Sequence, residues 1–359
     1  MSGKGFAVWA AALLASAAIA ATAPASAADP VADFYRGKQV KVIIGQQAGG
    51  TVDLLIRSVI RHMGKHLPGN PTFLPQNMDG AGGRVAANWL FNVAPRDGSV
   101  LGNLTQGTPM DQVRKEPGIQ FDVAKFQWLG NPLAVNSIMV AWTASGIGSL
   151  ADLKTKGGLI CGATAASSPT VVNTTVVKNL TGYDIRIIAG YPGVNDTVLA
   201  MARGEVNCLG ATNLPAAQVL WPTQFKEGKT AILIQLGTKK DPAISEFMGR
   251  DVPLISEFAR SDAERQVLDL INSGLTFGRP MLTPPEVPAE RVEALRRAFD
   301  ATMKDPEFIA EAKRQNADPI PVVGERLQEL AIQAAAASDD LVARVAALTT
   351  PKDIGQLKK

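Results

Sequence analysis

Short apolar segments rich in β-branched residues alternate with amphipathic segments along most of this 359-residue chain. The clearest unit is a strand predicted at Gln39–Gly45, which a glycine-containing loop joins to a helix predicted at Asp53–Leu67. Apolar side chains recur at the helical period on this helix, at Ile56, Ile60 and Met63. Strands that alternate with helices indicate parallel sheets covered by helices on both faces.

The length and order of these segments predict two lobes, because the chain is too long for one ordinary core. The last helices, from about 288 to 348, have no sheet of their own to cover. The economical arrangement returns the chain to the first lobe, with crossing strands near 138–142 and 275–278. We therefore expect an α/β fold of two doubly wound lobes with a binding cleft between them. The expected domains are residues 28–138 together with 278–359 (domain 1) and residues 139–277 (domain 2).

Residues 1–27 are typical of a cleavable export signal. Lys4 supplies a positive start, Phe6–Ala21 is a short apolar run, and Ala25 and Ala27 form a small-residue cleavage site. The apolar run is too short and too rich in alanine for a permanent membrane anchor. These features predict a protein secreted to the periplasm.

Composition argues against several functions. With 36 basic and 33 acidic residues, the net charge of +3 gives no electrostatic basis for binding nucleic acid. The two histidines, His62 and His66, lie four residues apart without an evident nucleophile partner or enough neighbouring ligands for a metal site. We therefore expect no catalysis, no cofactor and no bound metal.

Cys161 and Cys208 are the only two cysteines, and both fall in predicted strands of one lobe. Export would permit a disulfide between them. Two buried thiols are an equally good interpretation, and the sequence leaves both open.

The loops that follow the strands predict the ligand site, because ligands of parallel α/β sheets bind at the carboxyl ends of the strands. Glycines let backbone approach a ligand closely, and helix N-termini present free N–H groups to an anion. Asp53, in the first turn of its helix, is expected to be a structural capping residue. The predicted ligand contacts are Gln46, Gln47, Gly49, Gly50, Thr105, Thr108, Thr164, Ala165, Ser167, Ser168, Tyr191 and Asn213.

Short glycine- and proline-containing motifs follow one another in a characteristic order. The first loop contains the Gly49-Gly50 pair and Asp53. Residues 77–83 read N-M-D-G-A-G-G and residues 97–102 read D-G-S-V-L-G. Later segments read A-G-Y-P-G at 189–193, G-E-V-N at 204–207, P-P-E-V-P at 284–288 and K-D-P-E at 304–307.

In order and spacing these motifs resemble the TctC-like, or Bug, periplasmic receptors of tripartite tricarboxylate transporters. In that family the first three segments read P-F-P-P-G-G-G-T-D, N-R-P-G-A-G-G and D-G-Y-T-L-L. The resemblance covers nearly all of the chain from Phe34 onward. No single motif is decisive, but their combination is specific.

The resemblance implies a type II periplasmic-binding-protein fold and a small carboxylate held by loop amides, hydroxyls and bridging waters. It also implies docking to a two-subunit membrane permease without an ATPase, and we expect the receptor to be a monomer. Gln46 and Gln47 depart from the family pattern, as do Ala165 and Ser167, where the family has glycine. These positions are where we expect ligand selectivity to differ.

Two other functions are compatible with the same fold. The chain would suit a receptor that presents its ligand to a sensor kinase instead of a permease, and the sequence does not separate these. An exported α/β hydrolase is less favoured, because the fold alone assigns no chemistry and no catalytic triad is evident.

Overall fold

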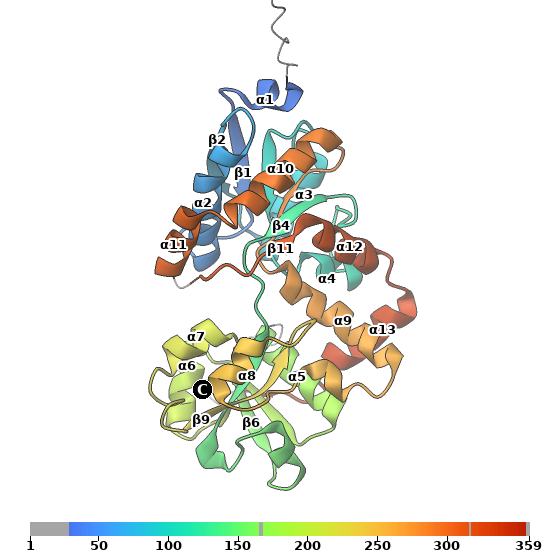
Figure 1. The fold of residues 1–359 in the computed structure, drawn as a ribbon. Coiled ribbons are helices and arrows are strands. Elements are labelled where there is room, and N and C mark those ends of the chain that lie inside the picture. The colour runs from blue at the N-terminus through green and yellow to red at the C-terminus, as the bar shows by residue number, and fades with distance from the viewer. Residues whose placement is uncertain (1–28, 165–167, 316, 357–359) are drawn as a thin grey trace, which may run out of the picture.

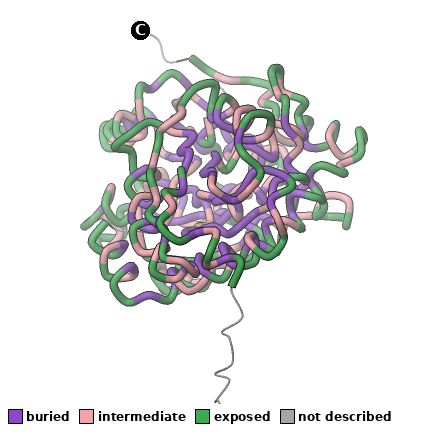
Figure 2. Tube along the Cα trace, turned by 90° about the horizontal axis from the view of Figure 1, so that it is seen from above, coloured by how far each residue is buried: buried purple, intermediate pink, exposed green. Residues whose placement is uncertain are grey.

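The computed structural model describes residues 29–164, 168–315 and 317–356, which form two lobes, each around a six-stranded sheet (Figure 1). The predicted export signal, residues 1–27, lies outside the described residues. Among the described helices, none has the length and apolar character needed to cross a membrane. Seen from above, buried segments gather in the interior and exposed segments surround them (Figure 2).

The first lobe has a mixed sheet in the order β11-β4-β10-β3-β1-β2. Strands β1, β2 and β3 are parallel, whereas β10 runs antiparallel to β3 and β4. Strand β10 enters from the second lobe at the edge where β1 and β3 end, so it has to run in the opposite direction. The strands are β1 (Gln39–Ile44), β2 (Thr72–Asn77), β3 (Val100–Asn103), β4 (Gln127–Asn131), β10 (Met281–Thr283) and β11 (Val322–Val323).

Helices cover both faces of this sheet. Successive side chains of β1 point to opposite faces, so Val40 and Val42 pack in one core with α2 and α10 while Ile43 packs in another with α3. The helices are α1 (Pro30–Tyr35), α2 (Thr51–Met63), α3 (Arg84–Asn92), α4 (Thr108–Val113), α10 (Ala289–Thr302), α11 (Pro306–Arg314) and α12 (Gly324–Ala335).

The second lobe has the strand order β12-β7-β6-β8-β5-β9. Strands β6, β7 and β8 are parallel, and β5 is antiparallel to both β8 and β9. The strands are β5 (Ser137–Trp142), β6 (Leu159–Ala163), β7 (Ile185–Ala189), β8 (Cys208–Thr212), β9 (Thr230–Leu236) and β12 (Gly355–Gln356). The helices are α5 (Pro169–Thr181), α6 (Val194–Ala202), α7 (Leu214–Leu220), α8 (Pro242–Met248), α9 (Asp262–Phe277) and α13 (Asp339–Thr349).

The two-lobed α/β fold is confirmed, but three local expectations are wrong. The sheets are mixed rather than parallel. The crossing expected as a strand near 275–278 is the last turn of α9 followed by Gly278, because the short apolar segment continues the helical period that begins at Asp262. The helix expected through residue 348 is interrupted at Ala336–Ser338, where Ser338 caps the start of α13.

The chain passes between the lobes at residues 132–136, at Gly278 and at the α12–α13 break (Figure 1). The end of the chain lies with the second lobe: α13 packs on α5 and α9, and β12 pairs with β7. The domain limits predicted from the sequence, which place residues 278–359 in domain 1, remain a proposal. In the structure the segment from α13 to β12 lies with the second lobe.

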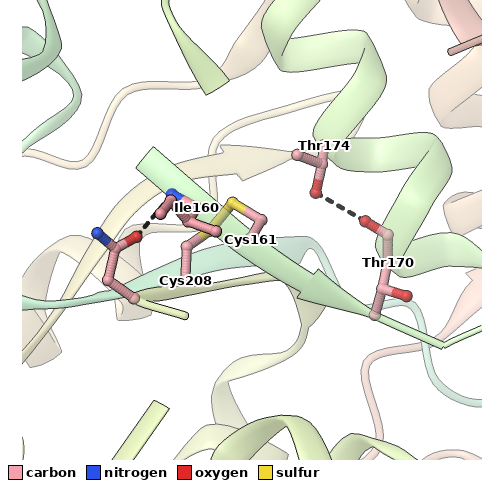
Figure 3. Close-up of a disulfide and its surroundings, with 6 residues drawn as sticks. Ile160, Cys161, Thr170, Thr174 and Cys208 are labelled. Atoms are coloured by element: carbon pink, nitrogen blue, oxygen red, sulfur yellow. Dashed lines mark hydrogen bonds between the residues drawn. A yellow bond between two sulfur atoms is a disulfide. The ribbon is translucent and has the colours of Figure 1, made fainter. Parts of the chain in front are cut away.

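A disulfide joins Cys161 of β6 to Cys208 of β8, directly across the two parallel strands (Figure 3). The structure therefore decides between the two interpretations that the sequence left open. Both cysteines are fully buried in the core of the second lobe.

Candidate functional site

Three loops of the first lobe surround a hollow of about 500 Å³ at the carboxyl ends of β1, β2 and β3. The parallel strands end at one edge of the sheet, which is why loops far apart in the sequence meet there. Of the predicted contacts, Gln46, Gln47, Gly50 and Thr105 line this hollow. Its polar groups are side-chain amides, two threonine hydroxyls, glycine backbone and the carboxylates of Asp53 and Asp79.

Asp53 holds the first loop in place rather than capping the helix. Its buried carboxylate accepts the Gly49 backbone N–H at 2.8 Å, Arg57 Nε at 2.9 Å and Asn77 Nδ2 at 2.9 Å. Asn77 Nδ2 also donates to the Gln46 carbonyl at 2.9 Å. Burial opposes the charged form most strongly, but the hydrogen bonds from Arg57, Gly49 and Asn77 together hold the pKa of Asp53 below its usual value. The predicted contact Gly49 is thus a structural anchor.

The second and third loops touch each other at Gly83. Its φ of +94° favours glycine, and a Cβ there would lie 2.8 Å from Thr105 Cγ2. Thr105 Oγ1 donates to the Gly82 carbonyl at 3.2 Å and lies 3.2 Å from Thr108 Oγ1. Thr108 is buried, so it supports Thr105 and does not line the hollow.

In the second lobe, a cluster of hydroxyls marks the start of α5. Thr170 Oγ1 lies 2.7 Å from Ser168 Oγ and accepts the Thr164 backbone N–H at 3.2 Å. Ser168 is the N-cap residue, yet its side chain makes no capping hydrogen bond. The predicted contacts Ala165 and Ser167 lie outside the described residues.

The structure places Tyr191 in the core of the second lobe. Its side chain is 6% exposed and packs in one cluster with Ile138, Val140 and Leu209. A Cβ at Gly162 would lie 3.2 Å from the Tyr191 ring, which shows how closely the ring sits against the sheet. Tyr191 lines none of the four main cavities formed by described residues.

A second cavity, of about 370 Å³, lies between the lobes. Gln106 and Gly107 reach it from the first lobe, and Pro169 and Asn173 from the start of α5. The predicted contact Asn213 lines it as well, with its side-chain oxygen held by the Ala216 backbone N–H at 3.0 Å. Asn213 also lines a neighbouring cavity of about 340 Å³ that includes Thr51 at the start of α2.

Sequence reasoning missed several polar residues of the interlobe cavity, among them Arg279 and Asn272. Arg279 lines both cavities at the lobe junction. Burial lowers the pKa of its guanidinium. No motif marks either residue, and the one signal in the sequence is that Asn272 stands between apolar positions of α9.

Helix α11 brings carboxylates to the histidine-bearing end of the first lobe, which the sequence did not reveal. Potential ligand atoms of His62, Asp305 and Glu307 lie within 4.8 Å of one another. Lys65 Nζ lies 2.7 Å from Asp305 Oδ2 and 2.6 Å from Glu307 Oε2. A lysine ammonium among these carboxylates favours an ion-pair network over a metal site.

Comparison with known proteins shows which solved structures share this architecture. No family model and no curated protein matches the chain. A TctC solute-binding protein from Polaromonas, without ligand, shares the fold with a TM-score of 0.67 and 17% identity, covering 86% of this chain and 99% of that one. Two further structures are similar: Rpa4515 from R. palustris with adipate (TM-score 0.55, 19% identity, 89% and 99% covered), and MatC from Rhodopseudomonas palustris with bound malate (0.54, 18%, 85% and 99%). The chain therefore has the two-lobed fold of the TctC-type periplasmic binding proteins.

Proposed function

We propose that this protein is an extracytoplasmic receptor of the TctC type that captures a small carboxylate between its lobes. It would deliver the ligand to the two-subunit permease of a tripartite tricarboxylate transporter. The motif resemblance supports this proposal, as does a shared fold that spans nearly the whole of each compared protein.

The observation that carries the proposal is that helices of both lobes begin, without a side-chain cap, at cavities of the lobe junction. Helix α2 begins after Gly50, which has no side chain, and α5 begins after Ser168, whose side chain makes no hydrogen bond to its helix. Thr51 and Pro169, the first residues of these helices, line the junction cavities. Uncapped helix N-termini favour an anion through free N–H groups and the helix dipole.

Two compared proteins point to the same ligand class, since one is described with adipate and another with malate. In this chain, Gln46, Gln47 and Thr105 would supply further hydrogen bonds to a carboxylate from the first lobe. Binding groups on both lobes would favour closure of the cleft around the ligand.

Thermal unfolding of the exported, mature protein against mono-, di- and tricarboxylates tests the proposal. A ligand at roughly 1,000 times its Kd stabilises the folded state by about 4 kcal/mol, which gives a clear rise in Tm. A Tm that stays constant with every acid would contradict the proposed function. Uptake of the bound acid by cells with and without the receptor gene then tests delivery to a permease.

A further inference from the structure

The backbone around Arg279 is fixed where the chain returns from the second lobe to the first. Its N–H donates to Asn131 Oδ1 at 3.0 Å. The preceding residue, Gly278, has a φ of +53°, and a Cβ there would lie 2.6 Å from the Leu133 carbonyl oxygen. Close packing on the first lobe thus sets the direction in which the Arg279 side chain leaves the backbone.

The Arg279 guanidinium has no counter-ion among the described residues. It takes part in no ion pair or side-chain hydrogen bond there, and burial is the sole cause of its lowered pKa. Removing a cation from water without a partner is unfavourable, so such a group favours an anion that enters the cavity.

Asn272 provides a second unpartnered group at the same cavity. The residue is 2% exposed and lies on α9, seven positions before Arg279. No hydrogen bond joins its side-chain amide to another described residue, and the amide is not among the fully enclosed groups that lack a partner, so it borders the cavity. A buried amide carries two N–H donors and a carbonyl acceptor that ordinarily find partners.

The remaining wall suits an anion with an apolar part. None of the described residues that line this cavity is Asp or Glu. Met110, Val135, Val172, Ile271 and Leu275 supply an apolar surface, while neutral polar side chains such as Gln106, Asn173 and Asn213 line other parts of the wall. A cavity of about 370 Å³ lies at the lower end of the size range of small-molecule sites.

We propose that Arg279 and Asn272 bind the carboxylate of the ligand at the lobe junction while the apolar wall receives its carbon chain. This inference rests on the proposed function and sharpens it, because it assigns a charged anchor and selects acids with an apolar chain. An arginine anchor also differs from the sequence-based expectation, in which mainly loop amides, hydroxyls and bridging waters hold the acid.

Calorimetric titration with hexanoate and adipate, each compared with its neutral amide, tests the anchor in the mature protein. We expect the wild type to bind each acid at least tenfold more tightly than the amide, and Arg279→Met to lose this preference. The loss of a charge-assisted contact weakens acid binding about 10- to 100-fold. Asn272→Ala should weaken binding of the acid less than Arg279→Met does. Arg279→Lys should retain part of the preference for acid over amide, because it keeps the charge.

Arg265→Met is the matched control. Arg265 lies on the exposed side of α9, the helix that carries Asn272; its guanidinium pairs with Asp262 and does not line this cavity. Its acid preference should match that of the wild type, and circular dichroism should show that every variant is folded.

The outcomes separate the two proposals. A folded Arg279→Met variant that keeps the wild-type acid preference overturns the anchor and leaves the proposed function standing. If the wild type binds other carboxylates but neither hexanoate nor adipate, the apolar-chain assignment is wrong. A wild type that binds no carboxylate at all overturns both.

Discussion

The side chain of Asn131 joins two of the three segments that pass between the lobes. Its Oδ1 accepts the Arg279 backbone N–H at 3.0 Å, and its Nδ2 donates to the Thr276 carbonyl at 2.9 Å. The same Oδ1 accepts the backbone N–H of Leu133 at 3.0 Å. One fully buried amide thus fixes the end of β4 to the end of α9 and to the start of β10.

Replacing Asn131 with alanine is expected to lower the free energy of unfolding by about 2 kcal/mol or more, because three backbone groups lose their partner in a buried position. Urea unfolding measures the change. Asn207→Ala is the control, since the Asn207 side chain accepts the Ile160 backbone N–H within the second lobe and does not line the interlobe cavity. Only Asn131→Ala should also change the affinity for the ligand, because it alone disturbs the backbone of Arg279. Equal affinities in the two variants would contradict this coupling.

Replacing Asp53 with asparagine is expected to loosen the first loop. The new amide has one oxygen, so its NH2 group faces either the donors of Gly49 and Arg57 or the Asn77 Nδ2 donor, and a buried donor loses its acceptor. A loss of about 2–3 kcal/mol in unfolding free energy and weaker ligand binding should follow. Asp79→Asn is the matched control, because Asp79 lines the same hollow but is exposed. A Asp53→Asn variant as stable as Asp79→Asn would show that the carboxylate does not anchor the loop.

The sequence predicted that the three loops meet better than it predicted the roles of their residues. Loops after β1, β2 and β3 were expected together, because parallel strands end at one edge, and the structure brings them there. The sequence did not predict that Asp53 anchors the first loop. This role depends on hydrogen bonds from Arg57 and Asn77, and only the folded structure brings these side chains to the Asp53 carboxylate.

Contacts between distant segments account for the predictions that were wrong or missed. Tyr191 was expected to face the ligand because it stands in a loop motif, yet core packing draws its ring under the sheet. Arg279 belongs to no motif. It becomes a candidate only in the folded protein, where the segment between α9 of the second lobe and β10 of the first lobe lines the interlobe cavity. A three-residue apolar segment near 275 carries too little periodicity to separate a strand from the end of a helix.

Low pH should destabilise the contact between α2 and α11. His66 Nε2 and Lys65 Nζ lie 2.8 Å and 2.7 Å from Asp305 Oδ2, and Glu311 contacts Ser58 and His62 in the same interface. Burial opposes ionisation most strongly, but these hydrogen bonds and the Lys65 and Arg61 charges hold the pKa values of Asp305 and Glu311 below their usual range.

Because the folded-state pKa is lowered, the stabilisation is fully present above the unfolded-state pKa of about 4 and is lost as the pH falls below it. Asp305→Asn removes this contribution at neutral pH. Its unfolding free energy should therefore be lower than that of the wild type at pH 7, with the difference shrinking toward pH 3. Glu290→Gln, at an exposed position of α10, should follow the wild type throughout. A difference between Asp305→Asn and the wild type that stays constant from pH 7 to pH 3 would count against the linkage.

Reduction of the Cys161–Cys208 disulfide should destabilise the second lobe while leaving its fold intact. The bond closes a segment of 47 residues, and in the chain-entropy model its loss costs roughly 4 kcal/mol because the unfolded chain gains freedom. The cysteines pair directly across two hydrogen-bonded strands, so the sheet keeps its register without the bond. We expect the Cys161→Ala/Cys208→Ala double variant to show a lower Tm and a native circular dichroism spectrum. Its ligand affinity should stay within about threefold of the wild type, since neither cysteine lines these cavities at the lobe junction. An unchanged Tm in the double variant, with the oxidised bond verified in the wild type by mass spectrometry, would show that the cross-link adds no stability.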